Sequence, residues 1–431
     1  MGTVVPEDIL LLVFDFVAHP APLSWPDAAY DDERAKAPFV LASVCQRWRT
    51  LAASAASLWT YFGFPAECHK LEPHILRLRV LMTRSRDAEV DVIGLWRDFP
   101  DIDPTGSKDI IITVVGIASR WRNVILKVPA SLKPTLSGAF HQQWPCLRSL
   151  SLDFLDEVVK LPLAPLLTQL YLGFSGALDC SDALLDFMPN LTKLSINGDG
   201  SEDTNKFLLA FAQQLTDLCI LEDVSLPPVQ PILFPRLQSL TVDDVLYLEH
   251  IRAPALQQLT FNTMHLPRAD VTQFASVRHL CLYGHVGGNL VSSLQWFTDI
   301  VQLSFNVSNH ATRTWPRSDN YTIERDFFAA VSVRSSASNS TPVWPHLEHI
   351  HFGHPGIMGE YAIEDPNDLI DFVIHRNTVQ ELDNEPNGAE NIRPARIQAV
   401  TVDFEGASEW LISELRRILP ATKGAAGSSD S

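Results

Sequence analysis

Apolar residues near the start of the chain follow the period of an α-helix. Their spacing is one, three, one and three residues, as in Ile9, Leu10, Val13, Phe14 and Val17. Residues at these spacings lie along one side of a helix. Pro6 suits the first helical position, where its missing N–H costs no hydrogen bond, and Glu7 and Asp8 favour the positive end of the helix dipole. The pattern therefore predicts a helix that begins at Pro6.

A second apolar stripe predicts a further helix in the same small module. It comprises Leu41, Val44, Cys45, Trp48 and Leu51, and the pair Leu58 and Trp59 follows. The segment between the stripes, residues 19–38, is rich in proline and acidic residues and is expected to form a loop. We expect Val44, Cys45 and Leu51 to lie in the core. Three short helices cannot bury every apolar side chain, so we expect Pro6, Ile9 and Leu10 to face outward.

From Trp144 onward, a short leucine-rich pattern recurs. Each copy has apolar residues at its first, fourth and sixth positions, and the copies begin at Leu147, Leu167, Leu191, Leu215, Leu237, Leu256, Val277, Ile300, Leu347 and Ile397. Their steps are 19 to 24 residues long, apart from two of 47 and 50. Each copy predicts a short strand whose inward residues are buried only when copies stack. The pattern therefore predicts an α/β fold, with a curved parallel sheet and with helices and loops on its convex side.

Residues that alternate with these leucines are expected on the concave face of the sheet. They are mostly small and uncharged, so a bound protein would be held by shape and neutral hydrogen bonds, with Tyr171 as an aromatic anchor. Cys219 and Cys281 would be exposed there. The residues expected to bind a target protein are Tyr171, Ser195, Cys219, Thr241, Thr260, Cys281, Ser304 and His351. The alternative is a sheet face that only water covers.

The remaining segments show weaker patterns. Trp121, Val124 and Leu126 indicate a degenerate strand unit, and Leu76, Leu78, Val90 and Val92 an earlier one. Short helices are expected at 181–188, 204–214 and 408–419. The expected organisation is a helical module at 1–63, a linker with degenerate repeats at 64–143, repeats at 144–406, a helix at 407–420 and a disordered tail at 421–431. The long insertions fall at 308–343 and 353–393.

The N-terminal segments together resemble an F-box. They are the Pro-led apolar run at 5–14, the Val44-Cys45-Gln46-Arg47-Trp48 segment and the ending Ser57-Leu58-Trp59. The repeats resemble irregular leucine-rich repeats, and the combined order resembles fungal F-box proteins. The resemblance implies a substrate receptor that docks on the Skp adaptor of an SCF ubiquitin ligase and, through it, on a cullin scaffold. The residues implied at or beneath the adaptor interface are Pro6, Ile9, Leu10, Val13, Phe14, Leu41, Val44, Trp48 and Trp59.

Composition and charge narrow the possible partners. The chain has 33 Lys and Arg against 51 Asp and Glu, a net charge of −18. Such a chain repels phosphate backbones, and we expect no nucleic-acid partner. The six cysteines are widely spaced and are expected to be reduced thiols, in the cytosol or the nucleus. No apolar run is long enough to span a membrane, and the N-terminus lacks the pattern of a secretory signal, so no membrane association is expected.

The sequence offers little that is typical of an enzyme. His349 and His351 would share one face of a strand and are the best candidates for a metal site, but no cysteine lies near them. Cys219 and Cys281 have no neighbouring cation in sequence to activate a thiol. We therefore expect no catalytic residue, no metal and no cofactor. Two alternatives to the receptor stay open: a protein-interaction scaffold without a role in ubiquitin transfer, and an enzyme on the concave face.

Overall fold

A computed structural model gives the fold of the chain. It describes residues 5–19, 30–64, 71–95, 104–128, 132–155, 161–174, 184–197, 202–221, 231–243, 245–262, 274–284, 286–294, 297–305, 321–332, 343–353, 361–382, 394–402 and 408–419. The chain divides into two compact units, Met1–Phe211 and Ala212–Ser431. This division falls inside the segment 144–406 expected to form the repeats. The tail at 421–431 lies outside the described residues.

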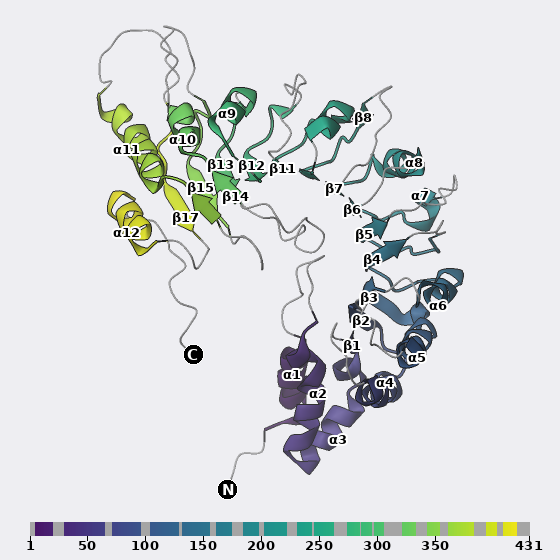
Figure 1. Cartoon of the computed structure of the whole chain (residues 1–431). Helices are drawn as coiled ribbons and strands as arrows, with labels where there is room; N and C mark the ends of the chain where they lie inside the picture. Colours follow the sequence, from purple (N-terminus) through teal and green to yellow (C-terminus); the bar gives the residue numbers. More distant parts are fainter. Residues whose placement is uncertain are drawn as a thin grey trace. The chain divides into compact units, whose positions relative to one another are not determined.

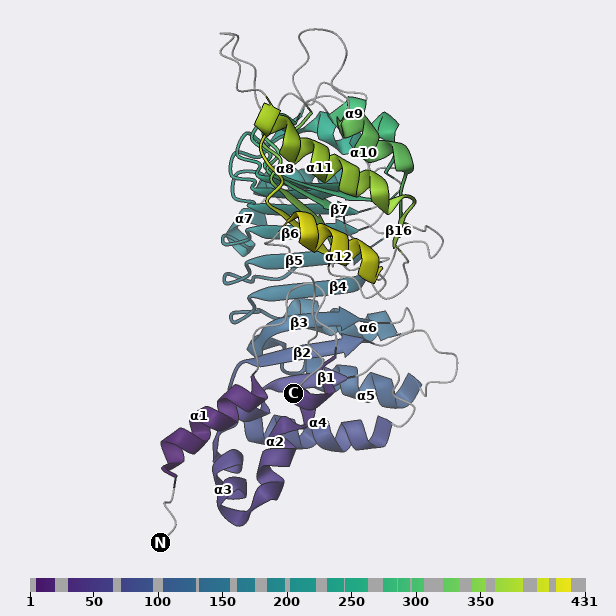
Figure 2. The ribbon, with the colours of Figure 1, turned by 90° about the vertical axis from the view of Figure 1, so that its left-hand side faces the viewer.

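The first unit, unit 1, combines a helical start with six parallel strands among its described residues. Its helices are α1 (Glu7–Ala18), α2 (Asp32–Val44), α3 (Gln46–Ser54), α4 (Leu71–Ser85), α5 (Pro104–Val115), α6 (Lys133–Leu136), α7 (Leu184–Phe187) and α8 (Glu202–Phe211). Its strands are β1 (Tyr61–Phe64), β2 (Val90–Leu95), β3 (Trp121–Lys127), β4 (Ser149–Leu155), β5 (Gln169–Phe174) and β6 (Lys193–Asn197). Each strand pairs in parallel with the next one in the chain. Figures 1 and 2 show this stack, and in Figure 1 α1 and α2 lie on the opposite side of β1 from α4 and α5.

The second unit, unit 2, also contains a parallel sheet, and its described α-helices lie between or after the strands. Its helices are α9 (Gly288–Leu294), α10 (Arg325–Ser332), α11 (Pro366–Leu382) and α12 (Glu409–Ile418). Its sheet comprises β7 (Asp217–Leu221), β9 (Ser239–Val242), β11 (Gln258–Asn262), β12 (His279–Tyr283), β13 (Gln302–Phe305), β15 (His349–Phe352) and β17 (Ala399–Val402), all paired in parallel in that order. Two further parallel pairs join β8 (Ile232–Leu233) to β10 (Ile251–Arg252) and β14 (Tyr321–Ile323) to β16 (Tyr361–Ile363).

The register of both sheets confirms the predicted repeat. In unit 1, Leu150, Leu170 and Leu194 lie side by side on β4, β5 and β6, and all three are buried. In unit 2, Leu240 and Leu259 are likewise paired and buried. Within each unit, equivalent leucines of successive copies therefore form an apolar layer. The fold is therefore the expected α/β arrangement of a leucine-rich-repeat-like solenoid.

The helical start differs from the sequence prediction in two places. The expected loop at 19–38 contains most of α2, because Asp31 caps that helix by accepting a hydrogen bond from the Arg34 N–H at 2.9 Å. The acidic residues Asp32 and Glu33 thus belong to a first helical turn, where the helix dipole favours them. The expected second helix is broken at Cys45, whose backbone is extended and whose thiol accepts a hydrogen bond from the N–H of Trp48. One apolar stripe therefore spans two helices, α2 and α3.

Strands and helices also form in segments whose sequence patterns are weaker. β3 confirms the degenerate strand at Trp121, and β2 confirms the one at Val90, whereas Leu76 and Leu78 lie in helix α4. β1 (Tyr61–Phe64) crosses the expected end of the helical module at residue 63. Of the two insertions, the structure describes β14 and α10 within 308–343, and β16 and α11 within 353–393.

Candidate partner-binding surface

Helices α1 and α2 expose an unusual number of apolar side chains. On α1 and the residue that leads into it, they recur at helical spacing, and α2 adds two more one turn apart. We call this set the outer surface, and its members are Val5, Ile9, Leu12, Val13, Phe16, Val17, Val40 and Val44. Phe16 is 79% exposed, and Leu12 is 67% exposed. Soluble proteins rarely leave so many large apolar side chains in water on neighbouring helices unless another molecule covers them.

The opposite side of α1 packs into the protein. Leu10, Phe14 and Ala18 are buried there, and the ring of Phe14 meets Trp48 edge to face with 4.8 Å between ring centroids. The guanidinium of Arg47 donates a hydrogen bond to the carbonyl oxygen of Val5 at 2.6 Å. Since α1 is apolar on both sides, its inner stripe anchors the helix while the outer surface stays available.

The structure places the predicted adaptor residues in two layers. Pro6, Ile9, Val13 and Val44 are exposed, Trp48 is half-buried, and Leu10, Phe14, Leu41 and Trp59 are buried. The expectation that Leu10 faces outward is wrong, because this residue lies on the inner stripe and is only 7% exposed. The expectation of a core position is wrong for Val44 and Cys45, which flank the break between α2 and α3, and is confirmed for Leu51.

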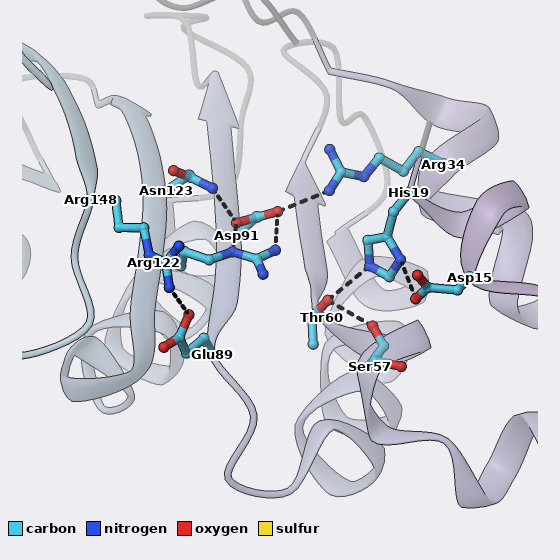
Figure 3. Close-up of polar contacts among 10 residues, drawn as sticks. All are labelled: Asp15, His19, Arg34, Ser57, Thr60, Glu89, Asp91, Arg122, Asn123 and Arg148. Atoms are coloured by element: carbon cyan, nitrogen blue, oxygen red, sulfur yellow. Dashed lines mark hydrogen bonds and ion pairs between the residues drawn. The ribbon is translucent and has the colours of Figure 1, made fainter. Parts of the chain in front are cut away.

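A buried carboxylate that the sequence did not reveal joins these helices to the sheet. Asp91 on β2 accepts a hydrogen bond from Arg34 of α2 at 2.9 Å and two from Arg122 of β3, at 2.9 and 2.8 Å (Figure 3). The side-chain amide of Asn123 donates another, at 2.8 Å. Burial by itself would raise the pKa of Asp91, but the hydrogen bonds and positive charge of Arg122, with the charge of Arg34, outweigh it and lower the pKa. Asp91 is therefore held as a carboxylate.

Apolar packing reinforces this junction. Ala35 of α2 packs in one cluster with Tyr61, Ile93, Leu95 and Ile125 of β1, β2 and β3, and Tyr30 packs against it. Arg34 lies over the ring of Tyr61, with 4.5 Å from the guanidinium carbon to the ring centroid. The backbone N–H of Asp31 donates to the Tyr61 hydroxyl at 3.0 Å, and burial raises the pKa of that hydroxyl to about 12. The inner side of α2 thus rests directly on the first three strands.

A second polar contact fastens the end of α1. The ring nitrogens of His19 lie 3.1 Å from a carboxylate oxygen of Asp15 and 3.2 Å from the Thr60 hydroxyl (Figure 3). Thr60 donates in turn to the carbonyl oxygen of Ser57 at 2.8 Å. This chain connects α1 with the residues just before β1.

The face of the sheets expected to bind a target is less accessible than predicted. The register sets Cys219, Thr241, Thr260, Cys281, Ser304 and His351 side by side in one row of unit 2, and Tyr171 beside Ser195 in unit 1. Tyr171, Ser195 and His351 are half-buried, whereas Cys219, Thr241, Thr260, Cys281 and Ser304 are buried. The expectation that the two cysteines are exposed is therefore wrong.

Longer neighbours explain part of this burial. His279 Nε2 lies 2.7 Å from the Ser304 hydroxyl, and the amide of Gln302 donates to the same oxygen at 3.3 Å. Burial lowers the pKa of His279, and the nearby ring of His351 lowers it further.

Among the described residues, no group of three or more His, Cys, Asp or Glu side chains could hold a metal ion, so His349 and His351 gain no third ligand there. Within the same residues, no helix combines the length and apolar character needed to cross a membrane.

Comparisons with known proteins give little beyond this geometry. No protein-family model matches the chain, and no characterised protein matches it in sequence. Among solved structures, the crystal structure of a TLR13–ssRNA13 complex matches with a TM-score of 0.36 and 13% identity. The match covers 70% of this chain and 41% of that chain, so this chain spans less than half the length of that protein. Because so low a TM-score carries no argument, the assignment of the fold rests on the strand order and register described above.

Proposed function

We propose that this protein is the substrate-recognition subunit of an SCF-type ubiquitin ligase. In this proposal, the outer surface of α1 and α2 binds the Skp adaptor, and through it a cullin, while the repeat face binds a target protein. The receptor itself catalyses no step, since ubiquitin transfer belongs to other subunits of such a ligase. A repeat sheet is suited to binding a protein, because equivalent side chains recur from strand to strand, and Tyr171, Ser195 and His351 are the predicted target-binding residues that stay partly accessible.

The exposed apolar outer surface is the observation that supports the proposal most. It coincides with the segments whose residues resemble an F-box, and its exposed members Ile9, Val13 and Val44 are among those that the resemblance implies in the adaptor interface. A surface composed of valine, leucine, isoleucine and phenylalanine gains free energy from being covered, at about 25 cal/mol per Å² of apolar area removed from water. A scaffold that does not use its adaptor contact for ubiquitin transfer would expose the same surface, so the experiment has to separate the two.

Co-purification of the Skp adaptor tests the first step. The variant combines Val13→Asp with Val44→Asp, two exposed positions on α1 and α2 where a charge does not enter the core. The matched control is Leu209→Asp on α8, an apolar residue that is 56% exposed, as Val44 is. We expect the wild type and the control to retain adaptor and cullin and the double variant to lose both, because burying an unpaired charge in an interface costs several kcal/mol.

Two outcomes would contradict the proposal at this step. Either the wild type fails to bind the adaptor, or the double variant binds it as well as the control does. Ubiquitin transfer to captured proteins in a reconstituted ligase then separates receptor from scaffold. Transfer that the double variant abolishes supports the receptor, and adaptor binding without any transfer supports the scaffold.

A further inference from the structure

The helix that presents part of the outer surface also forms part of the sheet's packing. On its inner side, Ala35 of α2 is buried against residues of β1, β2 and β3. On its outer side, Val40 and Val44 lie about one and a half and two and a half turns further along the same helix and are exposed. Pro38 lies between them and removes one backbone hydrogen bond, but α2 is continuous from Asp32 to Val44, so the position of the outer side follows that of the inner side.

We call the contact of Asp91 with Arg34 and Arg122 the junction. It would become unstable if either α2 or the strands β2 and β3 moved away. The side chains of Asp91 and Arg34 are only 7% and 9% exposed, and Arg122 is the second cation on the same carboxylate. If β2 and β3 opened while α2 stayed in place, the guanidinium of Arg34 would lose its carboxylate in a nearly buried position. If α2 left alone, Asp91 would lose one of its two cations. Removing one partner from a buried ion pair is strongly unfavourable, so the structure favours opening of both sides together.

We propose that α1 to α3 and β1 to β3 fold and open as a single cooperative unit, joined at Asp91, so that the outer surface is presented only when the first strands of the sheet are folded. The helices thereby act as the N-terminal cap of the repeat, and a chain with misfolded first strands has no intact surface for a partner. This inference goes beyond the proposed function and requires no particular identity for the partner.

Native-state hydrogen exchange on the full chain tests the coupling without any partner. The first variant, Arg34→Met, removes the bond from α2 and leaves Asp91 with Arg122 and Asn123. The second, Arg122→Met, removes the two hydrogen bonds from the Arg122 side chain on β3 and leaves Asp91 with Arg34 and Asn123. The matched control is Arg148→Met, which breaks only the exposed 3.5 Å pair between Arg148 and Glu89.

We expect each junction variant to accelerate exchange in α1 to α3 and in β1 to β3 by a common factor of about tenfold or more, the loss that follows from one buried charge-assisted hydrogen bond. The control should leave these rates within about twofold. Acceleration in α2 alone with Arg34→Met, or in β3 alone with Arg122→Met, would overturn the proposal, as would unchanged rates in both variants. If Arg34→Met does not fold, Arg34→Lys, which keeps a cation with fewer donors, replaces it. This variant should accelerate exchange by a smaller factor that is again the same in the helices and in the strands. Different factors in the helices and in the strands would overturn the proposal.

Discussion

Two phenylalanines on α1 offer the sharpest test of which side of this helix is available to a partner. Phe14 is fully buried and contacts Trp48, whereas Phe16, two residues later, is 79% exposed. The truncations Phe14→Ala and Phe16→Ala remove the same atoms from the same helix. They should therefore differ only through the environments of the two rings.

Phe14→Ala should affect mainly the stability of the protein, and Phe16→Ala mainly its binding to the adaptor. Phe14→Ala leaves a cavity and should lower the free energy of unfolding by about 3 to 5 kcal/mol. Phe16→Ala should change that free energy by no more than about 0.5 kcal/mol, because its ring already lies in water. If the adaptor covers Phe16, the same truncation should weaken binding by about 2 kcal/mol, which is about thirtyfold in Kd.

Calorimetric melting of both variants and titration with the purified Skp adaptor measure these quantities. A loss of stability in Phe16→Ala as large as in Phe14→Ala would refute the packing described for α1. Normal stability together with an unchanged Kd in Phe16→Ala would leave the packing intact and remove Phe16 from the interface.

Three further changes probe the junction and the repeat. Gly63→Ala places a methyl group 2.7 Å from a ring atom of Tyr61 and 2.8 Å from one of Tyr30, so unit 1 should lose about 1 to 3 kcal/mol in denaturant unfolding; an unchanged midpoint would show that the rings move freely. Because the pKa of Asp91 is lowered in the fold, its contribution is present above its unfolded pKa of about 3.9 and is lost as the pH falls through the folded pKa. The stability difference between wild type and Asp91→Asn should therefore stay constant from about pH 7 to 5 and shrink only below about pH 4, and a difference that shrinks near neutral pH would contradict this. The pKa of His279 is also lowered, so the fold favours its neutral ring. Wild type should therefore lose stability relative to His279→Gln as the pH falls below about 6.5. A difference in melting temperature between the two that stays the same at every pH would argue against this.

The repeat could be predicted from the sequence because its signal is local. Each copy carries its own leucines at fixed spacing, and side chains alternate along a strand, so the pattern alone assigned Thr241 and Thr260 to one row, as the parallel register confirms. Burial of that row could not be predicted in the same way. It depends on side chains of neighbouring strands, such as His279 and Gln302 beside Ser304, whose reach the spacing does not encode.

The helical module shows a different limit of prediction from the sequence. An apolar stripe predicts a helix but not which side faces the protein, and α1 is apolar on both sides, so the inner position of Leu10 was missed while Ile9 was assigned correctly. The pairing of Asp91 with Arg34 had no local signal, because the two residues are 57 positions apart in sequence. A charged residue inside an otherwise apolar strand, Asp91 within Val90–Leu95, was the one clue that a buried partner exists.

The register of unit 2 also bears on how such a chain can change in length. β13 and β15 pair without a shift, Ser304 beside His351, although β14 and α10 lie between them in the chain. Where the intervening segment is short, as between β9 and β11, the pairing is equally regular. Extra residues are therefore absorbed outside the ladder of backbone hydrogen bonds. Whole segments can be inserted, lost or exchanged between strands, during evolution or by protein engineering, while the row of side chains keeps its register across the strands.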